Sequence, residues 1–268
     1  MPKKNKSKSM SKGKSKKVCI VGQKRDSNQA SSHIVFQQRL EKRFSTQTKT
    51  SKKKNSLKLL ARKDLHDGIF SIQSFLSSEE CNDIIRLTEQ HGYVMTDQRE
   101  TRYAAHRRNG RIQITSEVLA EQLWPRVMQL FSPIEVGNNN EESLPVGLSS
   151  NFRFYKYGIG DRFGMHIDDS VPQEKGDTYY TLLVYLNEGS TGSKSSNSNS
   201  SNFQDLLGGA TNFYTGDSTK KAKLVLSVLP QQGTALIHEH YPHCMLHEGA
   251  AVTRGEKFLM RTDVVFSV

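Results

Sequence analysis

The stretch YGIGDRFGMHID, Tyr157–Asp168, decides how this chain is interpreted. It ends in His166 and Asp168, which stand two residues apart, so on a β-strand both side chains project from the same face. A second histidine, His247, stands in the sequence LHEG, and Lys257 follows it by ten residues. Two imidazoles and one carboxylate cover one face of an octahedral metal ion such as Fe(II) and leave three positions open. The spacing therefore predicts that His166, Asp168 and His247 are the metal ligands of a catalytic centre.

The carboxylate ligand has a rival in Asp169, the next residue along the chain. Asp169 is three residues from His166, so on a regular strand it points to the opposite face. We therefore favour Asp168 as the ligand.

The second imidazole has four candidates, which are His238, His240, His243 and His247. One alternative is a zinc site built from these histidines and Cys244, although the chain has no C-x-x-C pair. Another is that two or three of the histidines are buried and hydrogen-bonded. We favour His247 because an ordered pattern follows it, with Gly249, Val252, Gly255 and Lys257.

Lys257 opens the last predicted strand, after a turn over residues 254–256. A lysine there can hold the distal carboxylate of a dicarboxylic cosubstrate as a point charge. The alternative is a solvated lysine at a strand edge. Arg254 and Arg261 are competing cations, and Arg254 lies eleven residues after His243, which would pair these two in another register.

The positive charge is concentrated at the start of the chain. Residues 1–63 hold 20 of the 38 Lys and Arg residues and 2 of the 27 acidic ones, so this part is near +18 and residues 64–268 are near −7. Residues 1–17 are mostly Lys, Ser and Gly, which predicts disorder. With the second run at Lys52-Lys53-Lys54, they indicate a nuclear address or a nucleic-acid-binding arm, or else a solubilising tail.

The compartment follows from what the sequence lacks. No stretch approaches the roughly 18 apolar residues of a membrane span, and no apolar signal segment stands near the start. The three cysteines, Cys19, Cys81 and Cys244, are too few and too scattered for a disulfide framework. We expect an intracellular protein, in the nucleus or the cytoplasm, with no membrane partner.

The chain divides into a basic, largely disordered extension, 1–63, and one domain, 64–268. Residues 18–55 carry one short apolar run, Ile34-Val35-Phe36, which predicts at most an isolated helix outside the core. The Ser- and Asn-rich segment 189–202 is expected to be a loop inserted between two strands.

Local patterns predict helices followed by many strands. Residues 68–72 look like a first strand, and Ser77 with Glu80 forms a capping box that opens a helix to about Gln90. A second helix is expected over 116–131, kinked or divided at Pro125. From about residue 148 the apolar period is two, and the further strand candidates are 179–186, 210–214, 224–229, 234–238, 245–252 and 258–266. This order predicts an α+β fold, with helices on one side of a largely antiparallel sheet or barrel.

Three stretches together resemble one known family. Tyr157–Asp168 matches the signature Y-G-x-G-x-x-[YF]-x-x-H-x-D of the prolyl 4-hydroxylase group of Fe(II)/2-oxoglutarate oxygenases, and His247–Lys257 is similar to the distal motif of that group. Ser74–Cys81 resembles the opening helix of the same domain. The resemblance runs from about Ile69 to Phe266, nearly the whole part that we expect to be ordered.

The resemblance implies a double-stranded β-helix, or jelly-roll, with flanking N-terminal helices. It implies that His166, Asp168 and His247 bind iron, and that Lys257 and Tyr157 bind the C5 carboxylate of 2-oxoglutarate. For Tyr157 the alternative is simple core packing. The implied reaction consumes O2 and 2-oxoglutarate, with ascorbate as a further cofactor, hydroxylates a C–H bond and releases succinate and CO2.

The substrate that the resemblance implies is a protein or peptide residue, proline first, and a free amino acid is the alternative. Arg107, Arg108 and Arg111 either line a substrate entrance or form a solvated cluster. A different function is that of a non-catalytic protein which binds nucleic acid through its Lys-rich tail. A zinc hydrolase is a weaker alternative, because no H-E-x-x-H glutamate supplies a general base.

Overall fold

The computed structural model describes residues 27–51, 60–102, 104–136, 141–190, 205–216 and 219–267. The predictions for residues 1–17 and for most of 189–202 fall outside the described residues. Within the described part, no helix combines the length and the apolar character that crossing a membrane requires.

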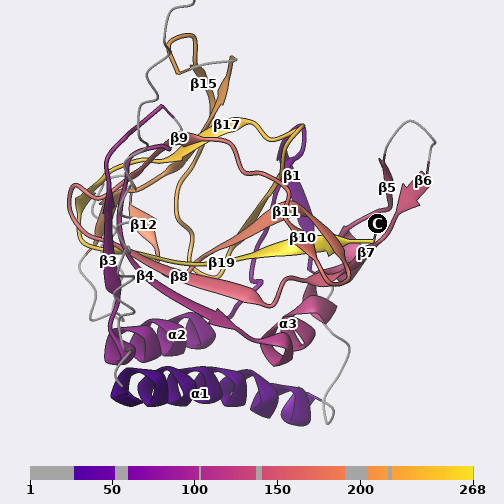
Figure 1. Ribbon diagram of the computed structural model, residues 1–268, viewed down its shortest axis with the longest axis vertical. Helices are drawn as coiled ribbons and strands as arrows, with labels where there is room; N and C mark the ends of the chain where they lie inside the picture. Colours follow the sequence, from indigo (N-terminus) through magenta and orange to yellow (C-terminus); the bar gives the residue numbers. More distant parts are fainter. Residues whose placement is uncertain are drawn as a thin grey trace, which may run out of the picture.

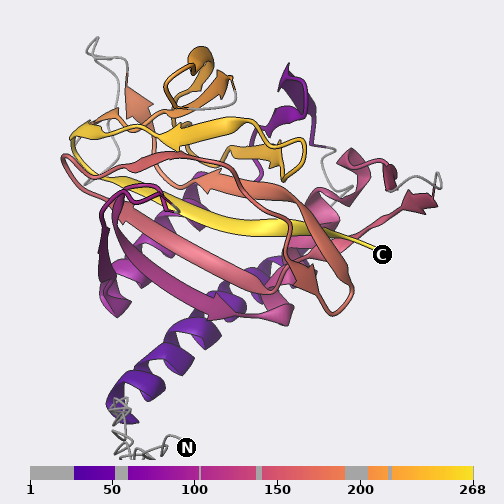
Figure 2. The ribbon, with the colours of Figure 1, turned by 45° about the horizontal axis from the view of Figure 1, so that its top comes forward.

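One long, rolled antiparallel sheet forms the body of the molecule (Figures 1 and 2). Its strands follow one another in the order β1 (Arg62–His66), β2 (Ile69–Ile72), β16 (Ala235–Glu239), β11 (Gly176–Tyr185), β19 (Lys257–Phe266), β8 (Asn151–Tyr157), β4 (Arg107–Thr115), β9 (Phe163–His166), β17 (Leu246–Gly249), β14 (Thr211–Thr215) and β15 (Lys223–Val228). The predicted jelly-roll is confirmed. Each strand candidate overlaps one of these strands, and only the candidate 245–252 is divided between two strands, β17 and β18.

Short strands complete the sheet and add two small ones. At the margins β3 (Val94–Gln98) pairs with β4, β7 (Pro145–Leu148) with β19, and β10 (Pro172–Gln173) with β11. The small sheets are β12 (Gly189–Ser190), β13 (Leu206–Gly208) and β18 (Val252–Arg254), and β5 (Ile134–Val136) with β6 (Glu141–Ser143).

The two predicted helices form, and the second is shorter than expected. Helix α2 (Ser78–His91) begins at the predicted capping box, in which the Ser77 side chain accepts from the Glu80 amide and the Glu80 side chain accepts from the Ser77 amide. Helix α3 spans Glu117–Leu123 and passes into the 3₁₀ turns η1 (Trp124–Arg126) and η2 (Met128–Leu130). Pro125 has no N–H and its ring clashes with the preceding turn, so the α-helix ends before it.

Helix α1 (Ser27–Ser51) corrects the prediction that residues 18–55 stay outside the core. It lies beneath α2 and α3 (Figure 1). Phe36, Leu40 and Phe44 recur every four residues on one face and are at most 3% exposed. An ion pair between Arg43 and Asp83 of α2 joins the two helices. The prediction was wrong because polar residues separate Phe36, Leu40 and Phe44 in the sequence. These three side chains form an apolar face only when the segment is helical and packs against the domain.

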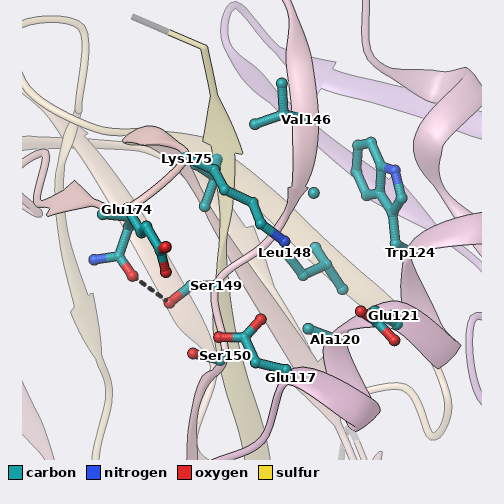
Figure 3. Close-up of a pocket in the computed structure, with 13 residues that line it drawn as sticks. Glu117, Ala120, Glu121, Trp124, Val146, Leu148, Ser149, Ser150, Glu174 and Lys175 are labelled. Atoms are coloured by element: carbon teal, nitrogen blue, oxygen red, sulfur yellow. Dashed lines mark hydrogen bonds between the residues drawn. The ribbon is translucent and has the colours of Figure 1, made fainter.

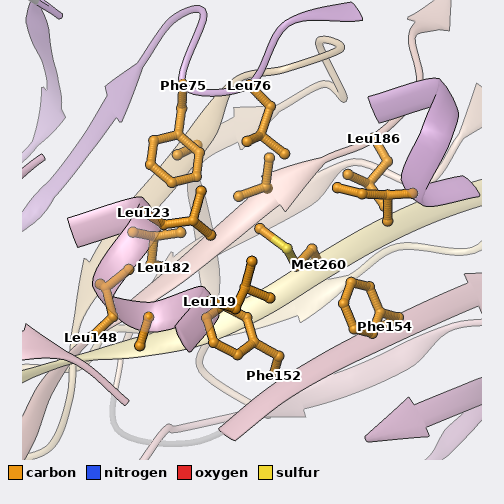
Figure 4. Packing of buried hydrophobic residues seen from close by; sticks show 14 of the residues in the cluster. Phe75, Leu76, Leu119, Leu123, Leu148, Phe152, Phe154, Leu182, Leu186 and Met260 are labelled. Carbon is orange, nitrogen blue, oxygen red and sulfur yellow. The ribbon is translucent and has the colours of Figure 1, made fainter. Parts of the chain in front are cut away.

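The hydrophobic core fills the layer between the helices and the sheet (Figure 4). Phe152 and Phe154 of β8 point into this layer, as do Leu119 and Leu123 of α3. Each such side chain contributes roughly 1.5–3 kcal/mol by leaving water. Because strand side chains alternate, the residues between the core positions of β8 face the inside of the roll.

Candidate active site

Strand pairing brings the predicted ligands together inside the roll. Strand β17 pairs antiparallel with β9 so that His247 lies opposite His166. Asp168 follows two residues after the end of β9. The distance from His166 Nε2 to Asp168 Oδ1 is 3.8 Å, and that from His247 Nε2 to Asp168 Oδ2 is 3.7 Å. The three residues can each offer one ligand atom, all within 4.8 Å of one another.

Backbone carbonyls orient both histidine rings toward the carboxylate. The Nδ1 of His166 donates to the Gly164 carbonyl at 2.8 Å, and the Nδ1 of His247 donates to the Met245 carbonyl at 2.9 Å. A carbonyl only accepts, so each ring carries its proton on Nδ1 and leaves the Nε2 lone pair free for a metal. Burial lowers the pKa of His166 to about 3 and also lowers the pKa of His247. Both imidazoles are therefore neutral at physiological pH, the form that binds metals.

The carboxylate of Asp168 is held at both oxygens. Arg261 Nη1 donates to Oδ1 at 3.0 Å, and the Thr181 hydroxyl donates to Oδ2 at 2.7 Å. Burial opposes ionisation, but the Arg261 charge and the surrounding histidines outweigh it and hold the pKa of Asp168 well below its usual value. The rival Asp169 is exposed. Asp168 is thus a fixed, ionised carboxylate.

A second row of polar side chains supports Thr181. His240, which is 3% exposed, has its Nε2 3.0 Å from the Thr181 hydroxyl and its Nδ1 3.2 Å from the Thr178 hydroxyl. Because Thr181 gives its own proton to Asp168, its hydroxyl can only accept from His240 Nε2, and His240 Nδ1 also lies 3.1 Å from the Thr178 carbonyl oxygen. His240 is therefore a buried, hydrogen-bonded histidine, one of the alternatives that the sequence left open.

The other two histidine candidates, His238 and His243, differ in position. His243 is exposed and lies outside the site. His238 is 3% exposed, and its Nε2 lies 3.7 Å from Asp168 Oδ2. His238, Cys244 and His247 also offer ligand atoms within 4.8 Å of one another, which is the zinc alternative. Burial raises the pKa of the Cys244 thiol to about 12, so the thiolate that zinc prefers is disfavoured there.

A cavity of about 50 Å³ is lined both by His166, Asp168 and His247 and by Lys257. Lys257 is 2% exposed and lies opposite Tyr157 of β8, with its ammonium 5.7 Å from the Tyr157 ring centre. Among the residues that the structure describes, it has no hydrogen-bond or ion-pair partner, and burial lowers its pKa to about 7. A glycine at position 209 makes room, because a Cβ there would lie 3.0 Å from Lys257 Cδ. The cavity thus ends at a buried amine without a counter-charge.

Tyr157 lines the same cavity. Its hydroxyl accepts from Asn109 Nδ2 at 3.1 Å, and burial raises its pKa to about 12. The phenol therefore keeps its proton, which it can donate to an anion beside Lys257. Of the competing cations, Arg254 is exposed and pairs with Asp205, whereas Arg261 is engaged by Asp168 and Asp263.

A larger hollow of about 250 Å³ lies elsewhere, beside α3, β7 and β10 (Figure 3). Glu117 and Glu121 of α3 and Lys175 lie at its wall, and the Ser149 hydroxyl donates to Gln173 Oε1 at 3.1 Å. None of the predicted site residues lines it. Size alone therefore does not mark the site of this molecule.

Sequence reasoning missed the residues that hold Asp168. It considered Arg261 only as a rival anchor, although Lys257 and Arg261 are four residues apart and share one face of a strand. That spacing could have placed Arg261 in the same cavity. Thr181 and Thr178 carry no such signal, because threonine is common in strands.

Comparison with known proteins gives similarity in structure alone. No family model and no curated protein sequence matches this chain. Similar solved structures include the viral collagen prolyl hydroxylase of Paramecium bursaria Chlorella virus-1 in its 2OG complex, with 19% identity, a TM-score of 0.47 and coverage of 75% of this chain and 97% of that one.

Two further structures have the same character. A prolyl-4-hydroxylase of Pseudomonas putida shows 16% identity and a TM-score of 0.43, covering 74% of this chain and 92% of that one. A prolyl hydroxylase of Trichoplax adhaerens, solved with a peptide fragment of the hypoxia inducible factor oxygen degradation domain, shows 18% identity and a TM-score of 0.46, covering 74% and 83%. The three similarities are thus in structure, at sequence identities of 16–19%.

Proposed function

We propose that this chain is an Fe(II)- and 2-oxoglutarate-dependent dioxygenase that hydroxylates a C–H bond of a protein or peptide residue such as proline. One observation carries the proposal: the Nε2 atoms of His166 and His247 face the Asp168 carboxylate at one end of a cavity, and an unpaired buried lysine stands at its other end. The products would be succinate, CO2 and the hydroxylated residue.

The residues present fit the iron that this function requires. Two neutral imidazoles and one carboxylate suit Fe(II) and occupy three positions on one side of the ion. When bound, Fe(II) supplies the redox chemistry by which O2 oxidises 2-oxoglutarate to succinate and CO2 and places one oxygen atom in the substrate C–H bond. Arg261 and Thr181 fix the Asp168 carboxylate, so the ligand set needs little reorganisation to bind the ion.

Lys257 and Tyr157 would bind the distal carboxylate of 2-oxoglutarate. The ammonium of Lys257 has no partner among the described residues, and in a buried site its attraction to an anion is stronger than it would be in water. The protonated Tyr157 hydroxyl can donate a hydrogen bond to the same anion.

The test is an anaerobic optical titration of the full chain with Fe(II) and 2-oxoglutarate. We expect a weak visible charge-transfer band that His166→Ala abolishes. Lys257→Ala should retain the band and require more 2-oxoglutarate to reach it. His243→Ala is the matched control, because His243 belongs to the same histidine run and lies outside the site.

The absence of any band from folded wild-type protein would refute the proposal. A separate experiment tests the substrate class. The iron-loaded protein is incubated with 2-oxoglutarate, ascorbate and proline peptides. Mass spectrometry of the peptides measures the gain of one oxygen atom, and free proline is the small-molecule comparison.

A further inference from the structure

Four arginines lie on the inner face of the sheet, beside the candidate active site. Arg111 of β4 stands directly opposite Tyr155 of β8, and Arg153 of β8 stands opposite Arg261 of β19. Residues opposite each other on neighbouring strands share one face of a sheet. Arg107 joins them, because its guanidinium lies 4.8 Å from the centre of the Tyr155 ring.

The arginine cluster consists of Arg107, Arg111, Arg153 and Arg261. One aromatic ring lies between this cluster and the proposed metal-ligand residues. The Arg107 guanidinium also lies 4.6 Å from the centre of the Phe163 ring, and that ring stacks on His166 with 3.7 Å between ring centres. Tyr155 and Arg261 line the cavity itself. A group bound to Arg107 would therefore sit beside a molecule placed at the metal.

Acidic partners cover only half of the cluster. Arg261 pairs with Asp168 and Asp263, and Arg153 lies 3.4 Å from Asp263. The partner of Arg111 is the neutral Gln113 side chain. Arg107 has no hydrogen-bond or ion-pair partner among the residues that the structure describes, and its Nε is buried.

Such an arrangement is costly in the absence of a ligand. Burial and the charges of Arg107, Arg153 and Arg261 lower the pKa of Arg111 against the opposing effect of Tyr155, so these like charges repel one another. A buried donor without an acceptor adds the cost of its lost hydration. The sequence outside the first 63 residues is acidic, so a positive cluster here differs from the average of its own domain.

We propose that Arg107 and Arg111 form a carboxylate-binding subsite, so that the substrate is a peptide segment with an acidic side chain near the residue that is hydroxylated. This inference rests on the proposed function. The guanidinium fork matches a carboxylate in two parallel hydrogen bonds. Arg108, the third arginine that the sequence singled out, faces Asp161 at 3.4 Å and is not part of the subsite.

A peptide carboxylate suits this subsite better than a nucleic acid does. Binding to a phosphate backbone uses many exposed Lys and Arg side chains along a surface. Here the donors are two partly buried arginines, Arg107 beside Tyr155 and Phe163, and Arg111 opposite Tyr155. A nucleic acid is therefore an outcome that the experiment must distinguish.

The experiment compares short fluorescent peptides of equal length, each with a central proline flanked by Glu, by Gln or by Lys. They are titrated into the full chain loaded with Mn(II) and 2-oxoglutarate. We expect the Glu peptide to bind roughly tenfold more tightly than the Gln peptide. Arg107→Gln and Arg111→Gln should remove this advantage, and Arg111→Lys, which keeps the charge, should restore part of it.

Arg86→Gln is the matched control, because Arg86 is exposed on α2, which packs on the other face of the sheet. The Lys-rich tail is present in every variant, so it adds the same binding to all of them. An equal Glu advantage in all variants, or none in the wild type, would overturn the inference. A single-stranded oligonucleotide that binds more tightly than the Glu peptide and loses affinity in Arg111→Gln would replace it with a nucleic-acid site.

Failure of the two proposals can be told apart. If Mn(II) and 2-oxoglutarate do not bind to the wild type, the proposed function fails, whereas the comparison of Glu and Gln peptides still measures the charge subsite. If they bind and the Glu advantage is absent, the dioxygenase proposal stands and the acidic substrate is wrong. Circular dichroism of each variant confirms that it is folded.

Discussion

Two cations on the same strand have opposite surroundings. Lys257 and Arg261 lie four residues apart on the inner face of β19. Lys257 has no acidic partner among the described residues, and burial lowers its pKa to about 7. Arg261 pairs with Asp168 and Asp263, and these carboxylates outweigh burial and raise its pKa further above its usual value. The charge of Arg261 is neutralised inside the fold, whereas we propose that the charge of Lys257 binds an external anion.

This difference indicates that the two cations have different roles in the site. Arg261 holds the Asp168 carboxylate, so its positive charge is already paired inside the fold. Lys257 pairs with no carboxylate among the described residues, and its side chain lines the cavity. Among the three candidate cations of the sequence, Lys257 is therefore the one we propose as the 2-oxoglutarate anchor.

The largest expected effect comes from removing the paired cation. Arg261→Met leaves Asp168 and Asp263 buried without their main partner, which should lower the free energy of unfolding by about 3–5 kcal/mol. It should also weaken Mn(II) binding, because Asp168 loses the donor that orients it. Urea denaturation and calorimetric titration measure the two effects. Arg254→Met, at an exposed pair with Asp205, should change stability by under about 0.5 kcal/mol.

Removing the unpaired cation should have the opposite effect on stability. Lys257→Met replaces a buried amine with an apolar side chain of similar length, so the ligand-free protein should become more stable, by on the order of 2 kcal/mol at pH 7. The same change should weaken 2-oxoglutarate binding by about 2–3 kcal/mol, since one charged hydrogen-bond donor is lost. Mn(II) affinity should not change. A variant that is less stable than the wild type would show that Lys257 has an internal role.

The sequence predicts only part of the contrast between Lys257 and Arg261. Which part it predicts depends on the contacts that create the contrast. Strand alternation predicted that His166 and Asp168 share a face. The register that sets His247 opposite His166, and the cavity that these residues line together with Lys257, are seen only in the fold. The support of Asp168 by Thr181 was not predictable, because it depends on how β11 packs beside the turn after β9.

Two other elements escaped prediction for the same reason. Strand β4 begins Arg107-Arg108-Asn109-Gly110, which shows no apolar alternation, because its inward residues face the polar cavity instead of the core. Helix α1 depends on the surface of α2 and α3, which a single sequence does not display. Residues that contact the core followed the rules of periodicity, and residues that contact polar or distant partners did not.

The pH dependence of 2-oxoglutarate binding sharpens the comparison further. The pKa of Lys257 is about 7 in the ligand-free fold and 10.5 for an ordinary lysine, so between these values the unfolded chain binds more protons. This residue therefore adds stability to the ligand-free protein as pH rises from about 7 to 10.5. Binding a dicarboxylate requires the charged amine, so 2-oxoglutarate affinity should fall by up to tenfold, about 1.4 kcal/mol, per pH unit above pH 7.

Titration of 2-oxoglutarate binding at several pH values checks this expectation. In Lys257→Met the slope above pH 7 should disappear, whereas Arg254→Met should keep it. An unchanged slope in Lys257→Met would assign the proton to another group of the cavity.

The smallest expected effect tests whether the stem of Lys257 must be held in place. Gly209 has a φ of +68°, and a Cβ there would lie 3.0 Å from Lys257 Cδ. Gly209→Ala should lower the free energy of unfolding by about 1 kcal/mol through backbone strain and should weaken 2-oxoglutarate binding several-fold by displacing the amine. Gly92→Ala is the control, since Gly92 has a φ of +87° with nothing within 4 Å of its added Cβ. If both variants lose similar stability and only Gly209→Ala loses affinity, the position of the lysine stem sets the affinity. Equal affinity in both would mean that the amine reaches the anion from more than one stem position, and the free charge of Lys257 alone would then distinguish it from Arg261.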